Sequence, residues 1–153
     1  MPIDSADLCS FSKSMLLEGA SEVQVRAAGS RAYYAAYHSL LWLGERLPPS
    51  VKCDPKSMHV GHRELQRRIS EWRVEGVHTD LANLKVVKTQ VSLALESARK
   101  FREVCDYELS DLISRNEANA QIERARRILR HAKQFHETVH PEPQPQPQDG
   151  VAA

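Results

Sequence analysis

The 153-residue sequence has few of the residues that interrupt helices or build a cross-linked scaffold. Glycine occurs only six times, and four of the eight prolines lie within the last 13 residues. The three cysteines are widely spaced and include no CxxC pair, which argues against a disulfide framework. The longest stretch without a charged residue, 32–44, is too short to span a membrane. A chain with so few breakers in its body is expected to be helical.

An excess of charge of either sign is also missing. The 21 lysines and arginines nearly balance the 20 aspartates and glutamates, for a formal net charge of +1. This balance excludes a strongly basic nucleic-acid module or an acidic solvating tail as a description of the whole chain. Asp4 and Asp7 occupy the region where a signal peptide would be basic, so we expect a cytoplasmic protein with reduced cysteines and no membrane partner.

Apolar residues recur at helical spacing in five segments. We predict helices over 5–17, 21–46, 58–72, 80–107 and 114–139, and no segment alternates for long enough to form a strand. In the first helix Leu8, Phe11 and Met15 are expected to face the core. The fold class is therefore all-α, an antiparallel up-and-down bundle of four to five helices over residues 1–139. Residues 140–153 form a Pro/Gln-rich tail whose composition predicts disorder.

The segment 21–46 is apolar around most of its circumference, which predicts a buried helix in the core or against a second chain. A glycine inside a helix costs about 1 kcal/mol relative to alanine, so we expect Gly29 to permit a close helix contact. Arg31, Tyr34 and His38 form a polar line on this helix, because residues seven apart lie within about 20° of each other. We expect Arg31 to be buried and to need a carboxylate, water or a phosphate.

Two interpretations of this polar line stay open. In the first, the line is a phosphodiester site, where Arg31 binds the phosphate and His38 transfers a proton. In the second, Arg31 pairs with a carboxylate in the core and His38 is an interior histidine with satisfied hydrogen bonds. Residue chemistry alone favours the second interpretation, because ion-pair networks also occupy such sites.

Residues 30–38, SRAYYAAYH, resemble the SRAYYAAFH signature of small prokaryotic HEPN-domain proteins (higher eukaryotes and prokaryotes nucleotide-binding). Weaker similarities follow in the family's order at 57–61, SMHVG, and at 102–107, REVCDY. The resemblance covers residues 5–137 and implies a HEPN-like antiparallel bundle that forms a homodimer.

The resemblance further implies a metal-independent endoribonuclease in which Arg31 and His38 are the catalytic pair and two copies meet across the dimer interface. It implies a role in a toxin–antitoxin, defence or RNA-processing system, with a nucleotidyltransferase as a possible protein partner and no cofactor. The alternative is a non-catalytic HEPN module that binds a partner protein or a nucleotide. Catalytic members usually carry a polar residue directly after the arginine, where this sequence has Ala32.

Further residues are expected to line or orient the pair. They come from the polar line itself and from the two weaker similarities, and they are Tyr34, His59, Arg102, Asp106 and Tyr107. His59 and His62 are three apart, but two histidines are only half of a metal site, and no metal is predicted.

The last predicted helix is basic. Its segment 115–133 carries six basic residues against two acidic ones. Such a run is usually a solvated face, and it also suits contacts with an RNA backbone that weaken with salt. We predict RNA contacts at Arg124, Arg127 and Arg130.

Overall fold

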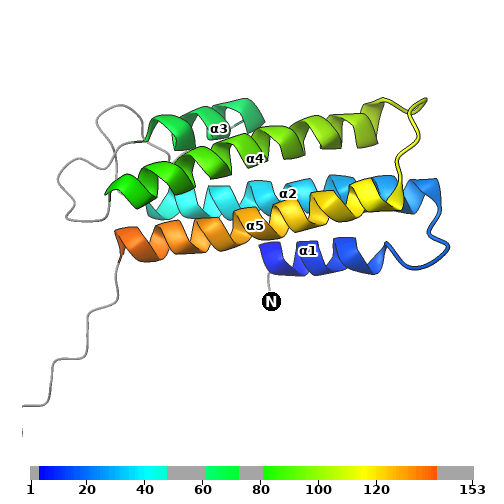
Figure 1. Ribbon diagram of the computed structural model, residues 1–153, viewed down its shortest axis with the longest axis horizontal. Helices are drawn as coiled ribbons and strands as arrows, with labels where there is room; N and C mark the ends of the chain where they lie inside the picture. The colour runs from blue at the N-terminus through cyan, green and yellow to red at the C-terminus, as the bar shows by residue number, and fades with distance from the viewer. Residues whose placement is uncertain (1–3, 48–60, 73–80, 141–153) are drawn as a thin grey trace, which may run out of the picture.

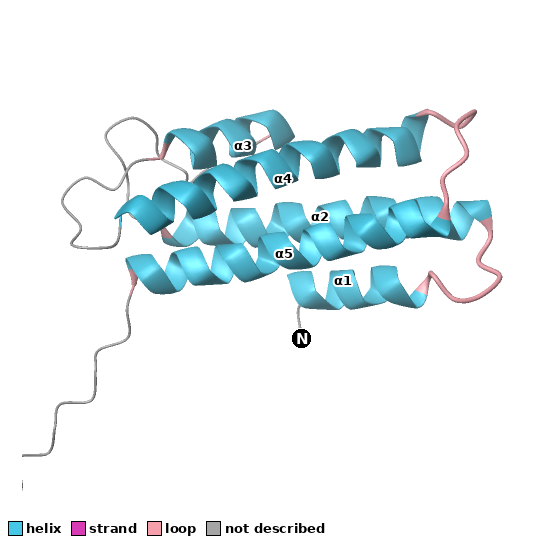
Figure 2. Ribbon diagram, viewed as in Figure 1, coloured by secondary structure: helices cyan, strands magenta, loops and turns pink. Residues whose placement is uncertain are grey.

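The computed structural model describes residues 4–47, 61–72 and 81–140 (Figure 1). These residues form five helices and no strand: α1 (Ser5–Ser14), α2 (Glu22–Arg46), α3 (His62–Glu71), α4 (Leu81–Tyr107) and α5 (Arg115–Val139) (Figure 2). The predicted all-α bundle is confirmed. The predicted tail from residue 141 onward, and residues 58–60 of the third predicted helix, lie outside the described residues.

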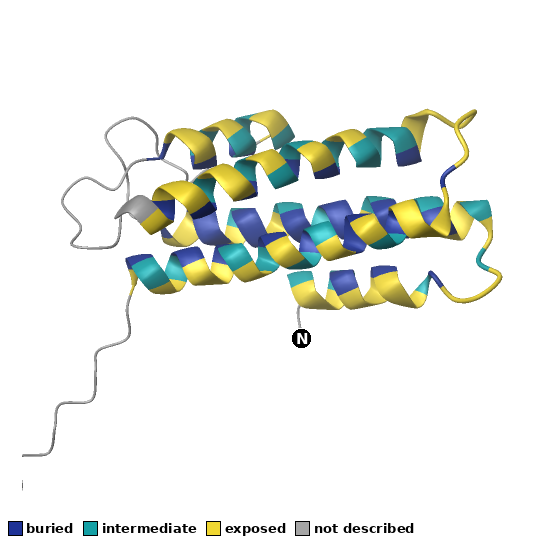
Figure 3. Cartoon of the chain, viewed as in Figure 1, coloured by how far each residue is buried: buried dark blue, intermediate teal, exposed yellow. Residues whose placement is uncertain are grey.

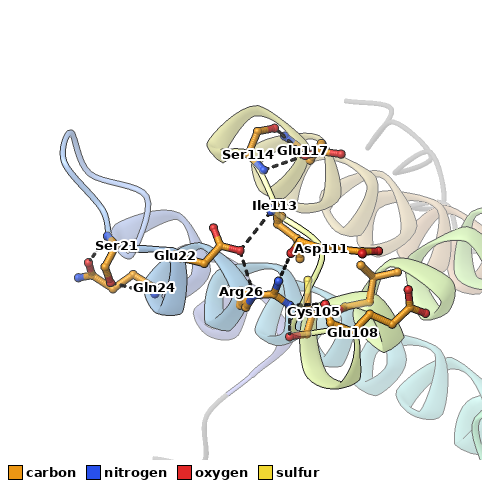
Figure 4. Close-up of polar contacts among 11 residues, drawn as sticks. Ser21, Glu22, Gln24, Arg26, Cys105, Glu108, Asp111, Ile113, Ser114 and Glu117 are labelled. Carbon is orange, nitrogen blue, oxygen red and sulfur yellow. Dashed lines mark hydrogen bonds and ion pairs between the residues drawn. The ribbon is translucent and has the colours of Figure 1, made fainter.

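Side-chain caps begin three of the helices, as the sequence indicates. Asp4 and Asp7 form a capping box at α1, Ser21 and Gln24 form one at α2, and Ser114 caps α5 with Glu117. Each box satisfies backbone N–H groups that the first helical turn leaves unpaired. Figure 4 shows the boxes at α2 and α5.

Helix α2 is the centre of the bundle and packs against all four other helices. Its predicted apolar stripe is buried throughout (Figure 3), over Val25, Gly29, Ala32, Ala36, Leu40, Leu43 and Leu47. Helices from the same chain therefore cover the apolar sides of α2, and burial alone does not require a second chain. In the part of the chain that the structure describes, no helix has the length and apolarity needed to cross a bilayer.

The α2–α4 pair lies between helices α3 and α5. Helices α3 and α5 each pack against both α2 and α4. Among the described residues the backbones of α3 and α5 do not come close to each other, and Trp72, directly after α3, reaches Phe135 of α5 with its ring. They therefore occupy opposite sides of the α2–α4 pair, with α1 beside α2 and α5 (Figure 1).

Side chains of α4 pack directly against Gly29 of α2. A Cβ atom at this position would come within 2.7 Å of Cys105 Sγ and 2.8 Å of Phe101 Cε1. Both distances are shorter than carbon and sulfur atoms tolerate, so the prediction of a close approach at Gly29 is confirmed.

Arg26 joins the start of α2 to the end of α4 (Figure 4). Its guanidinium donates through Nη1 to the carbonyls of Val104 and Cys105, at 3.0 and 3.1 Å, and through Nη2 to the carbonyl of Asp111. Its Nε donates to Glu22 Oε1 at 3.0 Å, and the same carboxylate oxygen accepts the Ile113 N–H. One side chain thus satisfies carbonyls that the C-terminus of α4 would leave unpaired.

The expected inward face of α1 is correct at Leu8 and Met15, which are half-buried against the core, and wrong at Phe11, which is 55% exposed. The fully buried residues are Cys9, Ser12 and Leu16. Both sets of residues have the same 3/4 spacing, so periodicity could not separate them. The buried Ser12 hydroxyl donates to the Leu8 carbonyl at 2.9 Å, which removes most of the cost of burying a serine.

Candidate functional site

Arg31 and His38 lie on the exposed side of α2. The expectation that Arg31 is buried is therefore wrong. Helices α1, α3, α4 and α5 cover the other sides of α2, and the polar line is the strip they leave uncovered. Neither side chain forms a hydrogen bond or ion pair with another residue in the described ranges. Both are thus available to a ligand.

Tyr34, between them, connects the exposed strip to α4. Its hydroxyl accepts a hydrogen bond from Arg102 Nη2 at 3.1 Å. The Arg102 guanidinium also lies 5.6 Å from the ring centres of Tyr34 and Tyr107, within cation–π range. Its Nε is 3.2 Å from Asp106 Oδ2, close enough for an ion pair but not aligned for a hydrogen bond.

The structure therefore brings together four of the five predicted supporting residues, Tyr34, Arg102, Asp106 and Tyr107. Asp106 also accepts from the Ser30 hydroxyl at 3.3 Å, which fixes it to the residue next to Arg31. His59, the fifth, lies outside the described residues.

His62, at the start of α3, belongs to the same cluster. Its Nδ1 is 2.6 Å from the Tyr33 hydroxyl, and its ring centre is 4.6 Å from that of Tyr37. Burial, and then the nearby Arg102 guanidinium, lower the pKa of His62. Burial also raises the pKa of Tyr33, so the phenol keeps its proton. Among the described residues, His62 Nδ1 is the hydrogen-bond acceptor within reach of this buried hydroxyl, so the Tyr33 O–H donates to it.

This contact determines the form of His62. A neutral imidazole that accepts at Nδ1 carries its proton on Nε2. His62 is thus a hydrogen-bond donor and a poor proton acceptor at its remaining nitrogen. The expectation that His59 or His62 lines the pair does not include this contact, because only the packing of α3 on α2 and α4 brings His62 to Tyr33.

The chemistry of this cluster suits a phosphate group. Arg31 and Arg102 supply positive charge, His38 can accept or release a proton near neutrality, and His62 can donate a hydrogen bond. Among the described residues, no group of three or more histidine, cysteine, aspartate or glutamate side chains has the geometry of a metal site.

The α5 arginines do not join this cluster within one chain. Arg124 is half-buried and donates to Gln121 Oε1 at 2.5 Å, while Gln121 itself donates to the Ala98 carbonyl in the core. Arg127 and Arg130 are exposed.

No protein-family model, curated protein or solved structure matches this chain.

Proposed function

We propose that the protein is a metal-independent endoribonuclease that acts as a homodimer, with Arg31 and His38 as its catalytic pair. The observation that carries this proposal is the exposure of both side chains on one side of α2, with no hydrogen-bond or ion-pair partner among the described residues. An arginine that is neither paired nor buried is free to bind a phosphodiester, and a histidine beside it can transfer protons.

The proposed reaction is cleavage by the 2′-hydroxyl of the RNA itself. The 2′-oxygen attacks phosphorus as His38 takes its proton, the P–O5′ bond breaks, and a general acid protonates the departing 5′-oxygen. Arg31 binds the phosphate and stabilises its developing negative charge. Arg102 adds charge at longer range, and Tyr34 and Asp106 hold its guanidinium in place.

The need for two proton-transferring groups supports the homodimer. One group must accept the 2′ proton while another donates to the leaving oxygen. His62 is a poor candidate for either role, because Tyr33 holds it as a neutral Nε2–H imidazole. A two-fold axis facing the exposed side of α2 would supply a second His38 from the partner.

The α5 arginines have a separate place in this proposal. Arg127 and Arg130 are exposed on α5, so they would contact RNA beyond the cleaved phosphate, as a charge-dependent and sequence-independent surface. Arg124 would contribute mainly through its position beside Arg127.

The alternative is a non-catalytic module that binds a nucleotide or a partner protein such as a nucleotidyltransferase. Ala32 favours it, because this residue is fully buried and places no polar group beside Arg31. Arg31 would then be a phosphate anchor and His38 a surface histidine.

Incubation of the purified protein with bulk RNA in EDTA tests the proposal. We expect the wild type to cleave, His38→Ala to bind without cleaving, and Arg31→Ala to lose both properties. Lys133→Ala, which removes an exposed charge from α5, is the control and should cleave normally. Cleavage by a folded His38→Ala protein at the wild-type rate would leave only the binding module.

A further inference from the structure

A second group of side chains lies on the exposed side of α2, one turn beyond His38. Trp42 is 36% exposed, although tryptophan is usually well buried in a protein of this size. The Arg46 guanidinium lies over its ring at 4.7 Å, and the His136 ring of α5 contacts it at 4.9 Å. His140 packs against His136 at 5.0 Å and also contacts the Arg46 carbonyl through Nε2, at 2.8 Å.

This group continues the line of the proposed catalytic pair. Trp42 is four residues after His38 and eleven after Arg31, so the three side chains lie within about 40° of each other around α2. Along the axis Trp42 is about 6 Å from His38. The spacing places the indole beside the phosphate that His38 would reach.

We propose that Trp42 is a stacking site for an unpaired base of single-stranded RNA, with Arg46 binding the adjoining phosphate. This inference rests on the proposed function, because it specifies the RNA that Arg31 and His38 would act on. An exposed aromatic ring flanked by cations is the combination that holds single-stranded nucleic acids. A duplex keeps its bases stacked inside and offers none to an indole on a helix surface.

The charges around Trp42 agree with a polyanionic ligand. Arg46 is exposed, and its Nη1 donates to the Trp42 carbonyl at 3.0 Å and lies 3.6 Å from Glu45, so a phosphate can replace the loose ion pair with Glu45. His136 adds a ring nitrogen on the same side, whereas His140 already donates through Nε2 to the Arg46 carbonyl. A purely apolar partner fits this surface poorly, because Trp42 is a single large apolar ring surrounded by polar groups.

The two tryptophans make the proposal measurable. Trp72 is 2% exposed and packs against Phe135 in the core, so only Trp42 can be quenched by a stacked base. The probe is a 2′-O-methyl oligoadenylate, which cannot be cleaved by its own 2′-oxygen. We expect it to quench the fluorescence of the wild type and to leave that of Trp42→Phe unchanged.

Four further comparisons make the test decisive. The duplex of the same oligomer and an abasic strand of equal length should not quench. Trp42→Leu should bind the single strand about 10- to 100-fold more weakly, the loss expected for one stacked base, while Trp42→Phe keeps most of the affinity. Leu93→Ala removes an exposed apolar residue from α4 and should change nothing.

Equal binding by Trp42→Leu, or quenching by the abasic strand, would overturn the stacking site. Because the probe is uncleavable, this result is independent of catalysis. An RNA-binding Trp42 in a protein that cuts no RNA would reject the proposed function and keep this inference.

Discussion

At the scale of single residues, Arg26 donates side-chain hydrogen bonds to five residues and has no role in the proposed chemistry. Its side chain is 11% exposed and donates to carbonyls on α4 and on the connection to α5. Hydrogen bonds from a charged donor are worth more than neutral ones, and a carbonyl left unpaired inside a protein is costly. Arg26 and Arg31 thus differ completely in environment, although both are arginines on one helix.

We expect Arg26→Met to destabilise the fold by about 3 kcal/mol, the cost of removing one partner from a buried charged network. For a chain of this length the melting temperature should fall by about 6 to 12 °C. Arg31→Met is the matched control and should change stability by less than about 0.5 kcal/mol, because its side chain is exposed. Thermal and urea unfolding followed by circular dichroism measure both. A similar loss in the two variants would contradict the assigned environments.

The pH dependence of stability depends in part on His62. Its pKa in the folded protein is below the unfolded value of 6.5, so the unfolded chain takes up a proton first as pH falls. The stabilising contribution of His62 is therefore complete above pH 6.5 and is lost as pH falls through the lower, folded pKa.

We expect the free energy of unfolding of the wild type to decrease more steeply between pH 7 and pH 5 than that of His62→Gln. His136, whose pKa burial and His140 also lower, remains in both proteins and so cancels in the comparison. Urea titrations at several pH values give the two slopes. Parallel slopes would show that His62 titrates as it does in the unfolded chain.

At the scale of helices, the sequence predicts the features that depend only on residues close together along the chain. Ser21 with Gln24, and Ser114 with Glu117, marked helix starts because a capping box needs only neighbouring residues. The exposure of Arg31 was not predictable in this way. It depends on how α1, α3, α4 and α5 divide the circumference of α2, and a nearly all-apolar helix gives no signal for the side that stays open. His62 and Arg102 meet across helices for the same reason.

The α2–α4 contact supplies a test at this scale. We expect Gly29→Ala to destabilise by about 1 to 2 kcal/mol, because crowding against Cys105 and Phe101 outweighs the helix propensity that alanine gains. Adding Cys105→Ala removes the nearest sulfur atom, so part of the loss should be recovered in the double variant. A double-mutant cycle by urea unfolding measures the coupling. Additive effects would show that Cys105 does not limit the approach.

At the scale of the whole molecule, the proposed active site is incomplete in one chain. Helices of the same chain bury the apolar sides of α2, so uncovered apolar surface gives no reason for a homodimer. The reason is the need for a second proton-transferring group.

Subunit mixing tests this directly. If each site needs His38 from both chains, a mixed dimer of wild type and His38→Ala is inactive. A threefold excess of His38→Ala should therefore reduce the activity per wild-type chain to about a quarter, because subunits pair at random. The same excess of a Lys133→Ala protein should not reduce it. Unchanged activity after complete exchange would place the whole site in one chain.

The hydrogen bonds from Arg26 to distant backbone carbonyls also have a kinetic consequence. They join residues 78 to 85 positions apart, so they form only after most of the chain has been brought together. Contacts of this kind are usually absent from the folding transition state, and their loss accelerates unfolding more than it slows folding. In stopped-flow measurements Arg26→Met should therefore unfold faster and refold at nearly the wild-type rate. Arg26 would then govern the lifetime of the native state, while the local helix contacts govern how quickly that state is reached.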